Sequence, residues 1–233
     1  MALLQLKDVS KIYRQGDSEV RALYHVDLEF NEGEFTTIYG PSGCGKTTLL
    51  NLVGALDRPT SGSVLFGGTG LHEMSKTQQA LHRRHHIGFI FQSHNLIPVL
   101  TAYENVEFAY QVIRKNDKRS GNDPVKDILT RVGLGDMLNR RPNALSGGQM
   151  QRVAVARALV KAPKLVLADE PTANLDSETS KEVLKVMVQM NRELNTTFIF
   201  STHDPMVMEY AHRVVGLRDG KIERDERTVQ ACT

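Results

Sequence analysis

The chain is poor in cysteine and has no long apolar segment. Its two cysteines, Cys44 and Cys232, are too few for a disulfide framework. No stretch stays apolar over the about 18 residues that a membrane span requires. Residues 1–13 lack a basic leader, a long apolar run and a cleavage site, so they predict a first strand and no signal peptide. Together these absences favour a reducing, cytoplasmic compartment.

Excess charge of one sign is also missing. The 29 Lys and Arg residues nearly balance 27 Asp and Glu residues, which leaves a net charge of +2. This balance argues against nucleic acid as the main partner. The 233 residues, 40% of them hydrophobic, suffice for one large α/β domain with a small inserted subdomain.

The N-terminal part of the chain has the alternation of an antiparallel sheet. Polarity alternates most clearly over residues 20–30, which predicts a half-exposed strand. Leu23 breaks this alternation. The side chains expected on the inner face are Val20, Ala22, Tyr24, Val26, Leu28 and Phe30.

Short apolar runs predict further strands, at residues 35–39, 63–66, 87–91, 165–168 and 198–201. The last two are typical of strands that are buried on both faces. The segment between them has the period of a helix, so this part of the chain predicts a βαβ unit. The apolar face of that helix is Val183, Met187, Met190 and Leu194.

Residues 101–161 differ from the rest because their pattern is almost entirely helical. This change predicts a helical subdomain inserted into an α/β core. The last ten residues are expected to form a loose tail.

A glycine-rich segment lies between the strand expected at 35–39 and a helix expected at 46–56. Its residues 40–47, GPSGCGKT, fit the Walker A pattern G-x-x-x-x-G-K-[ST]. In such a loop, backbone N–H groups surround a phosphate at the positive end of the following helix. Lys46 is expected to reach the β- and γ-phosphates, and Thr47 to place its hydroxyl on Mg²⁺. The residues expected to contact nucleotide are Gly40, Ser42, Gly43, Cys44, Gly45, Lys46, Thr47 and Thr48.

Residues 165–170, LVLADE, form the matching Walker B element, in which a buried strand ends in two carboxylates. Asp169 is expected to hold Mg²⁺, mainly through water. Glu170 is expected to polarise the attacking water beside the γ-phosphate. With Walker A, this element indicates a P-loop nucleotidase, and the guanine-reading pattern Asn-Lys-x-Asp is absent.

Residues 145–149, LSGGQ, indicate a second anion site, because Ser146 and two glycines open a helical run. One triphosphate seldom needs two such sites. A natural use for the second is to cap a nucleotide held by another copy of the chain.

In this order, and through nearly the whole chain, these motifs resemble those of the ABC ATPase family. The resemblance implies an α/β fold: a P-loop nucleotidase core with a mainly parallel sheet, an N-terminal antiparallel β subdomain and an inserted α-helical subdomain. It implies a single ABC ATPase domain over residues 1–233, with ATP and Mg²⁺ as cofactors. The core and β subdomain are expected at about 1–94 and 162–233, and the helical subdomain with the signature motif at about 95–161.

The resemblance also adds residues to the site. Tyr13 resembles the A-loop aromatic residue that stacks on adenine, and Gln92 the Q-loop glutamine that touches Mg²⁺ and the catalytic water. Asp176 ends residues 173–176, which resemble the D-loop at a dimer interface. His203 resembles the switch histidine that holds the γ-phosphate.

A head-to-tail homodimer follows from the resemblance, with two ATP molecules between the subunits. The residues that would reach the partner's nucleotide are Ser146, Gly147, Gly148 and Gln149. The metal-facing residues are expected to be Thr47, Gln92 and Asp169, and the catalytic residues Glu170, His203 and Lys46. Because neither Glu170 nor His203 is replaced, an active ATPase is expected.

Residues 55–62 and 92–98 resemble the bacterial group that serves lipoprotein release, macrolide efflux and peptide resistance. This implies a peripheral subunit on the cytoplasmic side of the inner membrane that powers export, extraction or mechanotransmission through an integral membrane permease. Two alternatives are an importer ATPase and a soluble ABC ATPase acting on DNA or ribosomes. The first often carries a C-terminal regulatory domain, and the second needs a long coiled coil or two cassettes; the chain has neither.

Two local features carry expectations of their own. Cys44 lies in an electropositive loop at a helix N-terminus, so a lowered thiol pKa is predicted. Five of the eight histidines lie within residues 72–94, beside Arg83 and Arg84. They are interpreted as a solvated basic face rather than a metal cluster.

Overall fold

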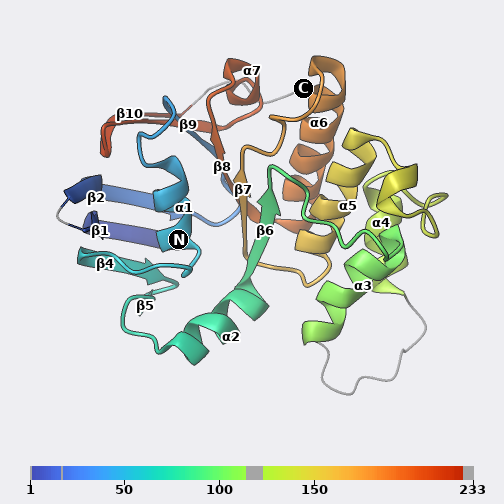
Figure 1. Ribbon diagram of the computed structural model, residues 1–233, viewed down its shortest axis with the longest axis horizontal. Helices are drawn as coiled ribbons and strands as arrows, with labels where there is room; N and C mark the ends of the chain where they lie inside the picture. The colour runs from blue at the N-terminus through green and yellow to red at the C-terminus, as the bar shows by residue number, and fades with distance from the viewer. Residues whose placement is uncertain (1, 17, 114–122, 228–233) are drawn as a thin grey trace.

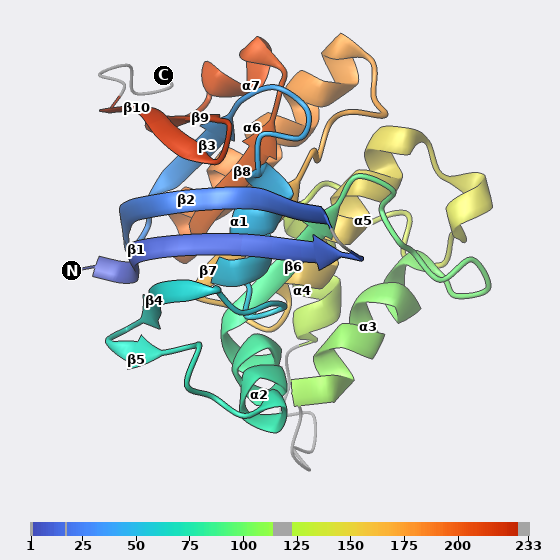
Figure 2. The same ribbon diagram turned by 60° about the vertical axis from the view of Figure 1, so that its left-hand side comes forward.

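The computed structural model of the chain describes residues 2–16, 18–113 and 123–227, and two sheets form its framework (Figure 1). The smaller sheet is antiparallel, with strand order β2-β1-β4-β5. Its strands are β1 (Ala2–Gln15), β2 (Ser18–Asn31), β4 (Ser61–Phe66) and β5 (Thr69–Gly70). Figure 2 shows β1 and β2 side by side along their whole length. This sheet confirms the antiparallel part of the fold expected from the alternation.

The larger sheet has six strands in the order β10-β9-β3-β8-β7-β6. They are β3 (Phe35–Tyr39), β6 (Ile87–Phe91), β7 (Leu165–Asp169), β8 (Thr197–Thr202), β9 (Arg213–Arg218) and β10 (Lys221–Arg227). Each strand is parallel to its neighbours, except that β10 is antiparallel to β9. Phe91 pairs with Asp169, which pairs with Ser201. The carboxyl ends of β6, β7 and β8 therefore meet at one edge of the sheet.

The central strands are buried on both faces because their side chains alternate between two apolar cores. Leu165 and Leu167 belong to the core shared with the antiparallel sheet and α1 (Lys46–Val53). Val166 and Ala168 belong to the other core, formed with the helices. A strand that is apolar at every position is stable only between two such layers.

Most helices pack on the face opposite the antiparallel sheet (Figures 1 and 2). They are α3 (Ala102–Ile113), α4 (Pro124–Arg131), α5 (Gly147–Leu159) and α6 (Ser177–Leu194), with a 3₁₀ turn at Pro142–Ala144 and the short α7 (Pro205–Met208). The expected apolar face of α6 is buried at Val183, Met187 and Met190. No helix in the described ranges is long and apolar enough to cross a membrane.

A bulge in β2 corrects the expected inner face of this strand. Leu23 is fully buried, whereas Val20 is 56% exposed and Tyr24 37% exposed. His25 has a φ of 46°, and the β1–β2 register shifts on both sides of it. One inserted residue reverses the alternation, so only the expected positions after the bulge, such as Val26, point inward.

The structure also corrects two boundaries and adds one helix. The helix expected at 46–56 ends at Val53, because Ala55 adopts a φ of 52°. Helix α2 (Lys76–His86) was missed, since Gln79 is its only buried residue and it has no apolar period. The expected loose tail is partly wrong, because β10 continues to Arg227; the last residues lie outside the described ranges.

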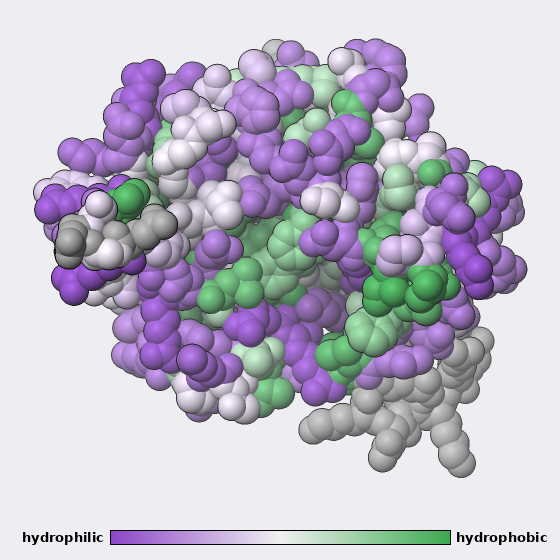
Figure 3. All heavy atoms as spheres, in the orientation of Figure 1, coloured by the Kyte–Doolittle hydropathy of each residue, from purple (hydrophilic) through white to green (hydrophobic). Residues whose placement is uncertain are grey.

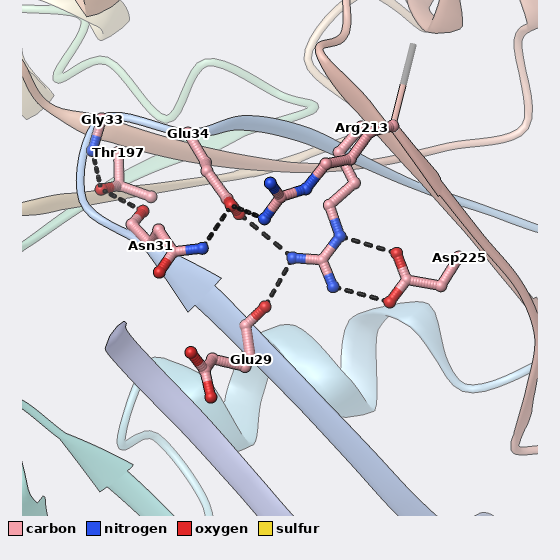
Figure 4. Close-up of polar contacts among 8 residues, drawn as sticks. Glu29, Asn31, Gly33, Glu34, Thr197, Arg213 and Asp225 are labelled. Atoms are coloured by element: carbon pink, nitrogen blue, oxygen red, sulfur yellow. Dashed lines mark hydrogen bonds and ion pairs between the residues drawn. The ribbon is translucent and has the colours of Figure 1, made fainter. Parts of the chain in front are cut away.

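A buried arginine joins both sheets to the C-terminal hairpin (Figure 4). Arg213 on β9 donates two hydrogen bonds of 2.7 Å to the Asp225 carboxylate on β10. It also donates to Glu34 at 3.1 Å and to the carbonyl of Glu29 on β2. The Asp225 carboxylate raises the pKa of Arg213 further. A buried charge is stable only when it is paired, so this network fastens the hairpin against the turn between β2 and β3.

Candidate nucleotide site

The Walker A loop follows β3 and leads into α1, as the sequence predicts. Gly43 and Gly45 have φ values of 78° and 110°, which favour glycine. A Cβ on Gly40 would lie 2.1 Å from the carbonyl oxygen of Leu217, and one on Gly45 would lie 2.4 Å from that of Ala22. The loop is thus held against both sheets by contacts that exclude a side chain.

Helix α1 begins without a side-chain cap. Its N-cap residue is Gly45, and no acidic residue lies in its first turn. The first N–H groups of a helix lack partners within the helix and carry partial positive charge. This end of α1 can therefore bind an anion such as phosphate.

Lys46 crosses the loop that precedes it. Its Nζ donates to the carbonyl oxygens of Gly40 at 2.7 Å and Pro41 at 3.0 Å, and the residue is 8% exposed. Two neutral acceptors hold the ammonium over the loop, and no carboxylate of the described residues forms an ion pair with it. Ser42 is exposed at the tip of the same loop.

Asp169, at the end of β7, lies beside the first turn of α1. The hydroxyl of Thr47 is 3.1 and 3.3 Å from the two Asp169 carboxylate oxygens. Ser201 on β8 also donates to Asp169. The structure therefore brings together Thr47 and Asp169, two of the three residues expected to face a metal.

Glu170 and His203 follow the neighbouring strands β7 and β8, and their side chains meet. His203 Nδ1 lies 2.9 Å from Glu170 Oε1. Because a carboxylate only accepts, this contact places the proton of a neutral imidazole on Nδ1. Glu170 has a φ of 48°, an uncommon value for a non-glycine residue that often marks functional sites.

Gln92, which directly follows β6, lies at the same edge. Its backbone carbonyl accepts a hydrogen bond of 3.0 Å from the Asn174 side chain of the expected D-loop. Among the described residues, the side chain of Gln92 has no hydrogen-bond partner. The structure therefore ties this residue to the D-loop but does not bring its amide onto Thr47 or Asp169.

Sequence reasoning missed two residues that connect the Gln92 segment to the signature. The imidazole of His94 lies near the backbone of Gly147, and burial lowers the pKa of His94. Arg157 on α5 donates to the carbonyl oxygens of His94, at 2.6 Å, and Asn95. The resemblance at residues 92–98 marks this segment but does not indicate these contacts, and the sequence does not reveal the φ values above 40° at His94 and Asn95.

The signature forms the start of α5, where Ser146 is the N-cap residue. Ser146 Oγ accepts from the Gln149 backbone, and Gln149 Oε1 accepts from the Ser146 backbone, a capping box. A Cβ on Gly148 would lie 2.3 Å from the Thr179 side chain on α6. Within the described part of one chain, no hydrogen bond joins the signature to the Walker A loop.

Asp176 begins α6 in the same neighbourhood. Its carboxylate accepts from the Thr179 backbone at 2.9 Å and from the Thr179 hydroxyl at 2.6 Å. The hydrogen bond from the Thr179 side chain lowers the pKa of Asp176. A D-loop side chain, Leu175, lies 3.1 Å from where a Cβ on Gly147 would be, so the expected D-loop and the signature are neighbours.

Tyr13 lies near the end of β1 and is 38% exposed. Its hydroxyl donates to Asp57 at 3.0 Å and lies near the side chain of Thr48 on α1. The Lys11 ammonium lies 4.8 Å from the ring centroid. Partial burial raises the pKa of Tyr13. The ring is thus fixed beside α1, as an adenine-stacking residue requires.

The prediction for Cys44 is wrong. The side chain is 4% exposed and packs in the core shared with the antiparallel sheet. Burial raises the pKa of the thiol, and the nearby Lys46 charge offsets this only in part. The histidine interpretation also needs correction, since His82 packs on Phe66 at 4.6 Å between ring centroids rather than facing solvent.

Known proteins share both this sequence and this fold. The family described as ABC transporter matches residues 23–173. The chain is 46% identical over 231 residues to the macrolide export ATP-binding/permease protein MacB of Syntrophobacter fumaroxidans, which covers 98% of this chain but 32% of MacB. The chain thus spans about a third of that relative. It is 43% identical to the lipoprotein-releasing system ATP-binding protein LolD of Geobacter metallireducens, over 96% of this chain and 99% of LolD.

A solved structure agrees with this similarity. The dimeric ATP-binding cassette MJ0796, bound to ADP and Pi in a post-hydrolysis state, is 41% identical and has a TM-score of 0.86. The match covers 96% of this chain and 98% of the MJ0796 chain. The expected α/β fold is confirmed by this neighbour. The chain belongs to the ABC transporter family, and it is one of that family's ATP-binding, ATP-hydrolysing cassettes.

Proposed function

We propose that this ATPase powers export, extraction or mechanotransmission through a membrane permease, working as a pair of identical subunits. The observation that carries this proposal is the convergence of the Walker A loop, Asp169, Glu170 and His203 at one edge of the central sheet. The choice of process follows the names of the relatives LolD and MacB. The whole chain, residues 1–233, is proposed to be a single ABC ATPase domain, with the helical subdomain at about 95–161.

The residues at this edge fit MgATP. Thr47 and Asp169 supply oxygen donors, which Mg²⁺ prefers, and we include Gln92 as a third metal-facing group. The metal, when bound, offsets phosphate charge and polarises the γ-phosphate. The uncapped start of α1 and Lys46 bind phosphate oxygens. Thr48 and the remaining loop residues Gly40, Ser42, Gly43, Cys44 and Gly45 complete this contact mainly through the backbone.

Glu170 acts on the attacking water. Its carboxylate accepts a proton from that water, and the hydrogen bond from His203 Nδ1 orients it. His203 also contacts the γ-phosphate. Tyr13 stacks on adenine with the ring face opposite Lys11, since the Lys11 ammonium covers one face.

The second subunit completes each site. Within the described residues, no hydrogen bond joins Ser146, Gly147, Gly148 or Gln149 to the Walker A loop of the same chain, so a nucleotide on another copy is their natural ligand. Asp176 lies next to them and joins the same interface. We propose a head-to-tail dimer, and the dimeric state of MJ0796 supports it.

The permease partner places the dimer on the cytoplasmic side of the inner membrane as a peripheral subunit. A cytoplasmic helix of the partner docks beside residues 95–100, where the segment after Gln92 meets the helical subdomain. Through Arg157 and His94, movement of the docked helix reaches the signature.

Capture of the closed complex tests this function. The tagged Glu170→Gln chain is loaded with MgATP in native membranes, and the co-purified proteins are identified. We expect a stable dimer with a membrane protein, because the variant binds ATP but cannot activate water. The matched control is Glu178→Gln, an exposed glutamate on α6 paired with Lys181; it should release its partner normally. Recovery of soluble or nucleic-acid partners alone would contradict the permease proposal.

A further inference from the structure

Asp57 follows α1 and joins this helix to the end of β1. Its backbone N–H donates to the carbonyl oxygen of Asn51 on α1 at 3.2 Å. One of its carboxylate oxygens accepts from the Tyr13 hydroxyl at 3.0 Å, and the other accepts from the Lys11 ammonium at 2.8 Å. A single carboxylate thus connects the expected adenine-stacking ring to the helix whose first turn is expected to bind phosphate.

Lys11 contacts both this carboxylate and the ring. Its ammonium also donates to the carbonyl oxygen of Arg58 at 2.8 Å, and its side chain is only 12% exposed. The ammonium lies 4.8 Å from the centroid of the Tyr13 ring, within the range of a cation–π contact. The cation is therefore fixed on one face of the ring, which leaves the opposite face for a base.

The segment that carries Asp57 is itself fastened to β1. The hydroxyl of Thr60 accepts from the backbone N–H of Ile12 at 3.0 Å, and the backbone N–H of Thr60 donates to the carbonyl oxygen of Ser10 at 2.8 Å. Figure 3 shows mainly hydrophilic surface over the antiparallel sheet on the face that it draws. Polar contacts rather than an apolar patch therefore hold an exposed ring in this part of the molecule.

The carboxylate of Asp57 is charged in these surroundings. Burial raises the pKa of Asp57, but hydrogen bonds from Lys11, the Arg58 backbone and Tyr13 outweigh burial and lower the pKa below its ordinary value. Hydrogen bonds to ionised groups are shorter and stronger than those between neutral groups. The pair of Asp57 and Lys11 is therefore a firm support for the Tyr13 hydroxyl and ring.

We propose that Asp57 and Lys11 are positioning residues for the adenine base of ATP and set the affinity for this base through the Tyr13 ring, an inference that rests on the proposed stacking of Tyr13 on adenine. An exposed ring loses rotational freedom when a base stacks on it. The bond to Asp57 and the contact with Lys11 restrict the ring before the base arrives, which lowers this cost of binding. Because Asp57 directly follows α1, the same pair fixes the ring relative to the phosphate site.

Steady-state kinetics and titration of the purified chain with MgATP test the pair. Asp57→Asn keeps the shape of the side chain but removes its charge, and Lys11→Met removes the ammonium but keeps the apolar stem. Each change should raise KM for ATP about fivefold, in the range of aromatic pair energies. The kcat should stay the same, because neither residue reaches the γ-phosphate. Affinity for tripolyphosphate, which contains no base, should also stay the same.

A double-mutant cycle shows whether Asp57 acts through the ring. Tyr13→Ala should raise KM for ATP at least about tenfold, because base stacking is lost. Adding Asp57→Asn to Tyr13→Ala should raise KM no further. The matched control is Asp127→Asn, which changes an exposed carboxylate paired with Arg131 on α4; it should leave KM and kcat unchanged.

Different results would contradict the positioning role and the proposed stacking. An unchanged KM in Asp57→Asn would overturn the positioning role alone. Weaker tripolyphosphate binding in Asp57→Asn, or a further fivefold rise in KM when it is added to Tyr13→Ala, would mean that Asp57 supports the fold around α1 instead of the ring. An unchanged KM in Tyr13→Ala would contradict the stacking of Tyr13 on adenine, and the positioning role with it.

Discussion

The N-termini of α1 and α5 are both glycine-rich anion sites, yet the two helices are capped in opposite ways. Helix α1 begins at Gly45 without a side-chain cap, whereas Ser146 and Gln149 close a capping box on α5. The first site is held open by close contacts around the glycines of its own loop. At the second site, the capping box of Ser146 and Gln149 supplies hydrogen-bond partners from the same chain, and His94 lies near Gly147. The difference suggests that α1 is built to hold a phosphate in the single chain, and α5 to meet one that arrives on another subunit.

The largest effect should follow from removing the cation at the start of α1. Lys46→Ala deletes the ammonium over the loop, and we expect MgATP hydrolysis to fall about a thousandfold, as for other lost charge-stabilising groups. Folding should change little, because the two carbonyl oxygens that Lys46 holds lie next to solvent-exposed loop residues. Hydrolysis rates and ATP titration of the purified chain measure this. Lys164→Ala serves as the control, and hydrolysis within tenfold of the parent chain would remove Lys46 from the mechanism.

Ser146→Ala tests the start of α5, and Ser75→Ala provides a matched control at another helix of the same chain. Ser75 forms the same capping box on α2 with Gln78, far from any phosphate site. Loss of either cap should cost about 1 kcal/mol of unfolding free energy. Only Ser146→Ala should also slow hydrolysis, about a hundredfold, because in the proposed head-to-tail dimer it alone loses a contact with the partner's nucleotide. Equal hydrolysis in the two variants would show that the α5 cap is purely structural.

These two helix starts also show which features of the site can be predicted from the sequence. The Walker A glycines and Ser146 are local signals, since spacing along the chain fixes their geometry. The edge formed by Asp169, Glu170 and His203 could be predicted as well, because parallel strands end together. The bond from Arg157 to the His94 carbonyl could not be predicted, since it joins residues 63 positions apart through a backbone atom that every residue has. Helix α2 was missed for a different reason: it has a cap but almost no apolar side to mark its period.

Arg157 offers a way to loosen α5 without touching its cap. Arg157→Met keeps the apolar bulk but loses the bonds to two carbonyl oxygens, which should cost about 2 kcal/mol of unfolding free energy. We expect hydrolysis to fall about tenfold while ATP binding to the α1 site is unchanged, because positioning losses are smaller than losses of a contact group. Isothermal titration and steady-state rates on the same preparation separate the two. A change in ATP affinity with normal turnover would mean that Arg157 supports the nucleotide site at the start of α1 and not the signature at the start of α5.

The smallest effect concerns Cys44, where the open start of α1 does not produce a reactive thiol. A helix N-terminus favours the thiolate, but burial disfavours it and the pKa is raised. A raised pKa means that less thiolate is present at pH 8 than in an unfolded chain, so iodoacetamide should modify native Cys44 at least about tenfold more slowly than the denatured chain. Cys44→Ser should leave hydrolysis within about twofold, since the loop uses its backbone. Mass spectrometry of tryptic peptides over time gives the rate at Cys44 separately from Cys232. If native Cys44 were alkylated rapidly and bound ATP prevented this, the loop would have to open far enough to expose the sulfur. The start of α1 would then differ from the capped start of α5 even more than the structure indicates.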